Sequence, residues 1–441
     1  MRDEQESFDI IERALDEANA DEADAVFISS DTNISRFANS NIHQNMSEIS
    51  AELTLRLFVD GAMGVSSTTS FEREDIAEMA DVAREAARHS LPLPNFRGLY
   101  RDGDVWRPAS AGRLKPVLIP PADKARALRQ VFQRDAQFAG AYSTSVSSIA
   151  CGNTHDVRRY CATTVAEATV IAIRGSDSGY ATAIARDCVD VIALADEAMQ
   201  KATLSSGRSA EIEAGAYDVI LEPAAIAEVL EWMDMITFSG QSFEDGSSFF
   251  VGNLGKQIVS PSLTIADDAI DPDFLPFPFD LEGLPKRRVA LIENGIIRTP
   301  VVDMIYADRL NIAPTANCWG LGSAEHGMAL HLSVAAGDAT REQLIRSTKR
   351  GIWVTRFNYV NGLLEPKTAL MTGTTRDGTF LIENGEVAAR LPNLRWTQSM
   401  LEAFSRIVGL TRERHRVGVW FNGFGGTLAP AMKIEGWRFE S

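Results

Sequence analysis

The stretch SRFANSNIHQN at residues 35–45 gathers an arginine, a histidine and three asparagines that could do chemistry. His43 could move a proton near neutral pH, and Arg36 could hold a carboxylate. No metal-ligand partner or nucleophile stands at a catalytic spacing beside them, so we predict no catalytic residue here. We expect Asn39 to open a turn, and Arg36, Asn39 and His43 to contact a substrate or a partner. An acid–base role for His43 with a nearby Asp or Glu is the alternative.

Other polar clusters do not match the ligand patterns of metal sites. His326 and His331 are five residues apart, which places them on opposite faces of a strand. The segment ADDAIDPDF at 266–274 lacks the glycine and glutamate spacing of a calcium loop, so its aspartates are expected to cap turns. We therefore predict no metal-binding residue in this chain.

The segment PAAIAEVLEWMDMITF at 223–238 predicts an amphipathic helix. Glu228, Glu231 and Asp234 recur at every third position along it. Paired carboxylates can act as acid and base, but this spacing is more typical of a solvated helix face, which is our expectation here.

Composition restricts the class of protein. The chain has 441 residues, a net charge of −17 and a pI near 4.9. Such a surface repels nucleic acid and anionic lipid, and the short basic run RERHR at 412–416 predicts only a solvated loop. No segment resembles a signal peptide or a bilayer span, and the four cysteines form no C-x-x-C pair. We expect a cytoplasmic protein with free thiols that binds neither nucleic acid nor membrane.

Hydrophobic periodicity predicts an α+β fold. Helices are expected at 5–20, 72–89, 121–138 and 191–204, with strands between them at 141–150, 157–173 and 179–184. A hairpin turn is expected at Asp60-Gly61, and the motif LIENG, at 291–295 and again at 381–385, predicts two more.

The expected fold class is N-terminal α/β units with antiparallel sheets and flanking helices, then a C-terminal β-rich domain with few helices. That last domain would be a sheet or a partial barrel. Connections at 91–108 and 204–215 are candidate boundaries. They divide the chain into an N-terminal α+β meander domain (1–100), a middle α+β unit (101–208) and the C-terminal β-rich domain (209–441).

Four segments, in order along nearly the whole chain, resemble those of the TldD/PmbA (TldD/TldE) family, once described as modulators of DNA gyrase. They are SRFANSNIHQN at 35–45, GKQIVSPSLTIADDA at 255–269, FPFDLEGLPKRRVALIENGII at 277–297 and GTFLIENGEV at 378–387. Each fragment is weak alone, but their order and spacing together are fairly specific.

The resemblance implies a catalytic TldD type that is a zinc protease, with a His-Glu-x-x-x-His helix completed by a C-terminal cysteine. Here the corresponding helix offers EWMDMI at 231–236 without histidine, and the last cysteine is Cys318. The chain therefore resembles the metal-free TldE (PmbA) type. No cofactor is expected in it, and zinc is expected only in a TldD-type partner.

By this resemblance the chain is a non-catalytic subunit of a TldD-type zinc metalloprotease complex that degrades or processes unfolded or extended peptides. The expected partners are a TldD-type catalytic subunit in a heterodimer, or a second copy in a homodimer, together with an extended peptide substrate. A stand-alone, self-associating peptide-binding or scaffold protein without protease activity is the alternative. The segment at 354–378 resembles TldD-related variants more than the TldE type.

Overall fold

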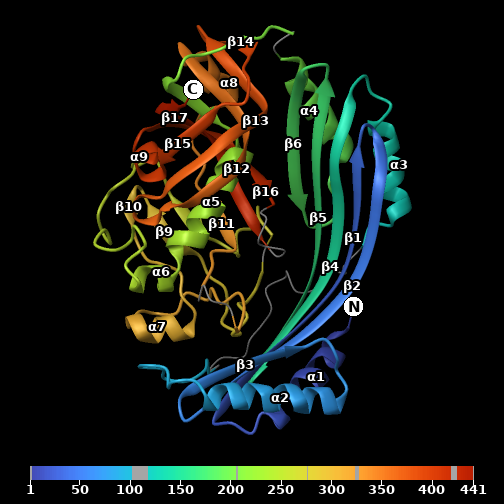
Figure 1. Cartoon of the computed structure of the whole chain (residues 1–441), viewed down its shortest axis with the longest axis vertical. Helices are drawn as coiled ribbons and strands as arrows, with labels where there is room; N and C mark the ends of the chain where they lie inside the picture. The colour runs from blue at the N-terminus through green and yellow to red at the C-terminus, as the bar shows by residue number, and fades with distance from the viewer. Residues whose placement is uncertain are drawn as a thin grey trace.

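The computed structural model describes residues 2–101, 118–204, 207–275, 277–322, 327–418 and 425–440. Two sheets lie beside each other in it, and the long strands of the first stand next to the more compact C-terminal unit (Figure 1). The predicted α+β class is confirmed. Among the described helices, none is long and apolar enough to cross a membrane.

The first sheet is antiparallel, in the order β3-β2-β1-β4-β5-β6. Its strands are β1 (Glu22–Ala38), β2 (Asn41–Val59), β3 (Ala62–Thr68), β4 (Gln137–Asn153), β5 (Arg158–Arg174) and β6 (Asp177–Ala185). Strand β1 pairs with β4 along most of its length, so the sheet is continuous across the predicted boundary at residue 100. The division into domains at 1–100 and 101–208 stays a prediction, but both segments supply strands to one sheet.

Helices cover one face of this sheet, and the C-terminal unit covers the other. They are α1 (Glu4–Glu17), α2 (Arg73–Arg88), α3 (Pro121–Val131) and α4 (Val191–Thr203). Helices α1 and α2 pack on Phe27 and Leu55, whereas α3 and α4 pack on Phe138. On the opposite face, Ile149 contacts a cluster that includes Phe279. The expected helix at 121–138 ends at Val131, because β4 begins a few residues later.

Left-handed residues form the predicted hairpin turns. Asn39 and Ser40 join β1 to β2 with φ of 50° and 54°, and Asp60-Gly61 joins β2 to β3. Both LIENG motifs turn at Asn-Gly, with φ of 51° and 76° at 294–295 and of 51° and 81° at 384–385. Asn and Gly tolerate this conformation better than other residues, which is why these turns could be predicted from the sequence.

The second sheet is mixed and has the order β10-β9-β8-β11-β17-β7-β12-β13-β14, with β15 on β13 and β16 on β17. Its strands are β7 (Gly215–Leu221), β8 (Ile265–Asp267), β9 (Val289–Glu293), β10 (Ile296–Ile297), β11 (His331–Val334), β12 (Arg350–Glu365), β13 (Leu370–Glu383), β14 (Glu386–Arg390), β15 (Arg395–Ser399), β16 (Ile407–Val417) and β17 (Gly426–Phe439). Within the described residues the strand order does not close into a barrel, and the predicted β-rich unit with few helices is a large mixed sheet.

The C-terminal unit also carries short helices. They are α5 (Pro223–Met233), a π-helical turn (Asp234–Phe238), α6 (Gly240–Glu244), α7 (Met304–Leu310), α8 (Arg341–Arg346), a 3-10 turn (Pro366–Thr368) and α9 (Met400–Ser405). Helix α5 packs against β12, β17 and β16, and its apolar side chains belong to the main hydrophobic core.

Candidate functional site

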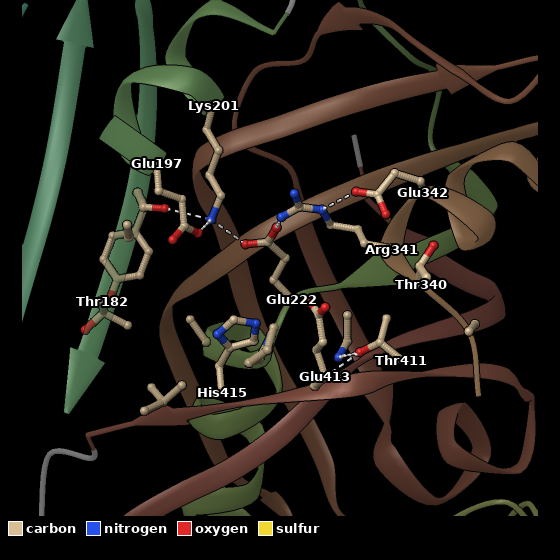
Figure 2. A pocket seen from close by; sticks show the side chains of 17 residues that line it. Thr182, Glu197, Lys201, Glu222, Thr340, Arg341, Glu342, Thr411, Glu413 and His415 are labelled. Atoms are coloured by element: carbon tan, nitrogen blue, oxygen red, sulfur yellow. Dashed lines mark hydrogen bonds and ion pairs between the residues drawn. The ribbon is translucent and has the colours of Figure 1, made fainter. Parts of the chain in front are cut away.

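A pocket of about 300 Å³ lies where β6, the edge strand of the first sheet, meets the C-terminal unit (Figure 2). Strand β6 contributes residues 180–182 to its wall, and α4 contributes Glu197 and Lys201. The opposite wall comes from the start of α5, from α8 and from β16. The pocket is therefore built by both sheets.

A buried ion network forms one side of this pocket (Figure 2). Glu222, which directly precedes α5, accepts hydrogen bonds from Lys201 Nζ at 2.6 Å and from Trp353 Nε1 at 3.1 Å. Arg341 lies 3.3 Å from the same carboxylate. Lys201 also contacts Glu197 at 2.8 Å. The network joins α4 of the first sheet to three elements of the C-terminal unit.

The charge state of Lys201 follows from these contacts. Burial on its own would lower the pKa of Lys201, but the carboxylates of Glu222 and Glu197 outweigh burial and raise the pKa above its ordinary value. The lysine is therefore an ammonium, held between carboxylates, and cannot serve as a neutral base near pH 7. Removing one partner of such a buried pair costs about 3–5 kcal/mol, so the network fastens the two sheets together.

The open side of the pocket carries polar side chains that are not arranged as a nucleophile and a base. Glu413 and His415 are exposed on β16, and Thr182 faces them from β6 (Figure 2). In the described part of the chain, His415 has no hydrogen bond to a hydroxyl or carboxyl group that could form a nucleophile–base pair. The geometry is that of a binding pocket.

The structure places Arg36, Asn39 and His43 at the β1–β2 hairpin, all three exposed. Asn39 forms the turn, as predicted. The register shifts between Arg36 and Phe37, whose partners on β2 are Gln44 and Ile42, so His43 is left unpaired in a bulge. No side chain in the described residues forms a hydrogen bond with His43, so the alternative acid–base role gains no partner there.

Arg36 shares a face of the sheet with the pocket. It lies opposite Ala141 on β4, Ala141 lies opposite Thr169 on β5, and Thr169 lies opposite Thr182 on β6. Residues directly opposite each other point to the same side, so Arg36 and Thr182 belong to one row, roughly 14 Å apart across three strand spacings. Contact of Arg36, Asn39 and His43 with a substrate or partner stays a prediction.

The expectation of a solvated acidic face on the helix at 223–238 is wrong. Glu231 and Asp234 are buried, and the backbone N–H of Ala329 donates to Asp234 Oδ1 at 3.0 Å. Burial raises the pKa of Asp234 to about 8. Helix α5 carries apolar residues on several sides, and a helix that is apolar all round is enclosed by protein.

A second buried polar cluster lies close to these acids. Asp267 Oδ2 accepts from Lys286 Nζ at 3.2 Å and from Asn317 Nδ2 at 2.8 Å, and its Oδ1 accepts from the backbone N–H of His331 at 2.8 Å. Burial opposes ionisation of Asp267, but Lys286, His331 and these hydrogen bonds lower its pKa below the ordinary value. Lys286 thus already supplies the cation that a buried carboxylate needs.

The remaining candidate metal ligands do not converge. His331 lies in β11, as a strand residue, while His326 is outside the described residues. Asp271 and Asp273 both lie within ion-pair distance of Arg414, at 3.2 and 3.4 Å. Across the described ranges, no three His, Cys, Asp or Glu side chains are grouped so that they could hold a metal ion.

The fold described above matches that of a solved structure over nearly its whole length. The TldE crystal structure from Thermococcus kodakarensis superposes with a TM-score of 0.87 over 98% of this chain and 99% of that chain, at 20% identity. At that identity the likeness establishes the fold alone.

Sequence comparison supplies the family. Residues 214–441 match the family described as PmbA/TldA metallopeptidase C-terminal domain, and residues 23–87 match PmbA/TldA metallopeptidase domain 1. The chain belongs to the PmbA/TldD family.

Individual relatives are distant. Metalloprotease PmbA from Escherichia coli O157:H7 is 24% identical over 412 residues, which is 86% of each chain. A metalloprotease from Methanothermobacter thermautotrophicus is 22% identical over 217 residues, 49% of this chain. The chain spans about half the length of several curated relatives that it matches, 47% in this last case.

Proposed function

We propose that this chain is the non-catalytic, TldE/PmbA-like subunit of a cytoplasmic, TldD-type zinc metalloprotease complex that degrades or processes unfolded or extended peptides. The observation that carries this proposal is the helix after β7. In this position the chain has buried Glu231 and Asp234 and no histidine. The family name implies a metal, and these residues do not fit one.

The donor set explains why. Zinc in a peptidase needs neutral imidazoles or carboxylates and an open coordination position. Burial raises the pKa of Asp234 to about 8, so this carboxyl would have to release a proton to bind zinc, and the sequence at 223–238 offers no imidazole to join it. Asp267 is already paired with Lys286. Zinc chemistry is therefore assigned to a TldD-type partner, and none is derived from this chain.

The role left for this chain is to bind peptide and to shape the complex. Strand β6 ends the strand order of the first sheet, and among the named strands in the described residues β16 pairs with β17 alone; both line the pocket. An extended peptide could add to such an edge through main-chain hydrogen bonds, with side chains entering the neighbouring pocket. Arg36, on the same face as Thr182, would extend this wall.

Co-expression with the TldD-type protein of the same genome tests the proposal. We expect one heterodimer peak in size-exclusion chromatography, and cleavage of an unfolded peptide that depends on both chains. Two separate peaks, with peptidase activity unchanged on adding this chain, would contradict the proposed role.

One observation favours the alternative of self-association. Tyr359, Leu363 and Leu364 on β12 are 87%, 65% and 50% exposed, and Tyr359 adopts a left-handed φ of 57°. Exposed apolar groups of this kind are typical of contact surfaces. If the isolated chain is a dimer that Leu363→Ser converts to a monomer, and no TldD-type protein binds it, the scaffold function replaces the subunit function.

A further inference from the structure

A second hollow, of about 430 Å³, adjoins the pocket, and arginines line it. Thr182 and His415 line both spaces. Strand β6 forms one side of this groove, through residues 182–184, and β16 forms another. The full set of lining residues is Thr182, Ala183, Ile184, Asp273, Arg412, Arg414, His415, Arg416 and Leu428.

The basic run was expected to be a solvated loop, and this expectation is wrong. Residues 412–416 belong to β16, and Arg414 to Arg416 pair with residues 428–430 of β17. Backbone hydrogen bonds hold a strand whatever its side chains are, and charged residues are common on edge strands. The strand thus fixes three arginines along one wall of the groove.

Only one of these arginines is neutralised. Arg414 pairs with Asp271 and Asp273 and also donates to Ser333 Oγ at 3.1 Å. Among the described residues, Arg412 and Arg416 donate to backbone carbonyl oxygens alone, those of Asp338 and Asp273. In the described parts of the chain, no carboxylate lies within ion-pair distance of Arg412 or Arg416.

A further guanidinium lies close to Arg416. The pKa of Arg186 is lowered, mainly by burial and in addition by the positive charge of Arg416. Like charges repel, so the groove is a place where an added negative charge is stabilised. The chain has 60 acidic and 43 basic residues, so this local group of arginines is opposite in sign to the net charge of the whole molecule.

We propose that the groove between β6 and β16 binds the carboxylate groups of acidic, extended peptides. This proposal rests on the proposed function, because it specifies the class of peptide that the subunit receives. Guanidinium groups present a planar set of donors that matches a carboxylate, and two unpaired guanidiniums can each take one. Acidic peptide is therefore held by Arg412 and Arg416 beside the edge strand β6.

Nucleic acid fits the same charges less well. A phosphate backbone repeats its charge along its whole length, and it would meet a chain of net charge −17 outside the groove. Asp273 lines the groove and Glu413 lines the adjoining pocket. A few carboxylates on a short peptide avoid this repulsion.

Fluorescence anisotropy with the full-length chain tests the inference. The probe is a labelled seven-residue peptide with three glutamates, compared with versions in which glutamine or lysine replaces them. We expect the glutamate peptide to bind at least tenfold more tightly than the other two, with affinity falling as salt rises. The double variant Arg412→Gln/Arg416→Gln should weaken this peptide at least tenfold and leave the glutamine peptide unchanged.

Controls separate the basic groove from net charge. Arg129 is exposed on α3, on the helix-covered side, so Arg129→Gln removes a positive charge without touching the groove and should not change binding. Amidating the peptide's C-terminus distinguishes the two sources of carboxylate: retained binding supports recognition of the glutamate side chains, and complete loss of binding on amidation would overturn it in favour of the terminal carboxylate.

Several results would overturn the inference. These are equal binding of the glutamate and glutamine peptides, no detectable binding of the glutamate peptide at 1 mM, wild-type affinity in the double variant, or displacement of the peptide by a single-stranded oligonucleotide at equal concentration. The proposed subunit role is judged separately, by co-elution with a TldD-type protein. The double variant should still form that complex.

Discussion

Replacing Glu222 with Gln should weaken the contact between the two sheets. Glutamine keeps the shape and the hydrogen bond from Trp353 but removes the charge that holds Lys201 at 2.6 Å. Loss of one partner from a buried pair costs about 3–5 kcal/mol. Glu197 still contacts Lys201 but is 43% exposed, so it compensates only in part. We expect the free energy of unfolding to fall by about 3 kcal/mol.

Urea unfolding followed by tryptophan fluorescence measures this loss. Glu342→Gln is the matched control, because Glu342 lines the same pocket but its side chain is 62% exposed and lies 3.8 Å from Arg341. A surface pair of this kind contributes at most about 1 kcal/mol. Equal, small losses in the two variants would refute the view that the Lys201–Glu222 pair fastens the sheets.

The pH dependence gives a second check on the same pair. The pKa of Lys201 is higher in the folded protein than its ordinary value. Its stabilising contribution is therefore complete below the unfolded pKa and is lost as pH rises through the folded pKa. The difference between wild type and Glu222→Gln should be constant from pH 7 to 9 and shrink above pH 10.5. A difference that grows with pH would contradict this.

Three further changes have defined outcomes. His43→Ala should leave stability unchanged and should not abolish the peptidase activity of the complex, since the side chain is exposed and has no hydrogen-bond partner in the described structure; abolished activity would support its acid–base role. Asp234→Asn should flatten the pH dependence of urea unfolding between pH 4 and 8. Burial raises the pKa of Asp234 to about 8, so over this range the folded protein keeps a proton that the unfolded chain loses, and wild-type stability falls as pH rises. Identical profiles of the two proteins would contradict this. Gly179→Ala should destabilise the fold by about 1–3 kcal/mol, since the new Cβ would lie 2.1 Å from an α4 carbonyl oxygen, whereas Gly215→Ala, whose Cβ would have its nearest neighbour at 3.8 Å, should show little change by thermal unfolding.

Local features of the fold were predictable from the sequence. The turns at Asn39-Ser40 and at the two LIENG motifs contain residues in the left-handed backbone conformation. Asn and Gly favour this conformation, so the turns could be predicted from the sequence. The leucines at 53, 55 and 57 alternate with polar residues, as is typical of a half-buried strand, and all three are fully buried on β2.

Long-range features were not predictable in this way. The carboxylate of Glu222 meets Lys201 and Arg341 across 21 and 119 positions of the chain, and no local pattern encodes such a meeting. The acids of α5 were misjudged because spacing along one helix says nothing about what covers its outer side. The basic run at 412–416 was assigned to a loop because its charge was taken as evidence of solvent exposure. It is instead part of a strand, because the backbone of Arg414 to Arg416 pairs with β17.

Zinc content measured on the purified isolated chain and on its co-purified complex tests the central claim most directly. We predict no stoichiometric zinc in this chain alone and one zinc per heterodimer with a TldD-type protein, because the segment at 223–238 carries the buried acids Glu231 and Asp234 and its sequence contains no histidine. One zinc bound per isolated chain, retained through dialysis against a weak chelator, would contradict the account.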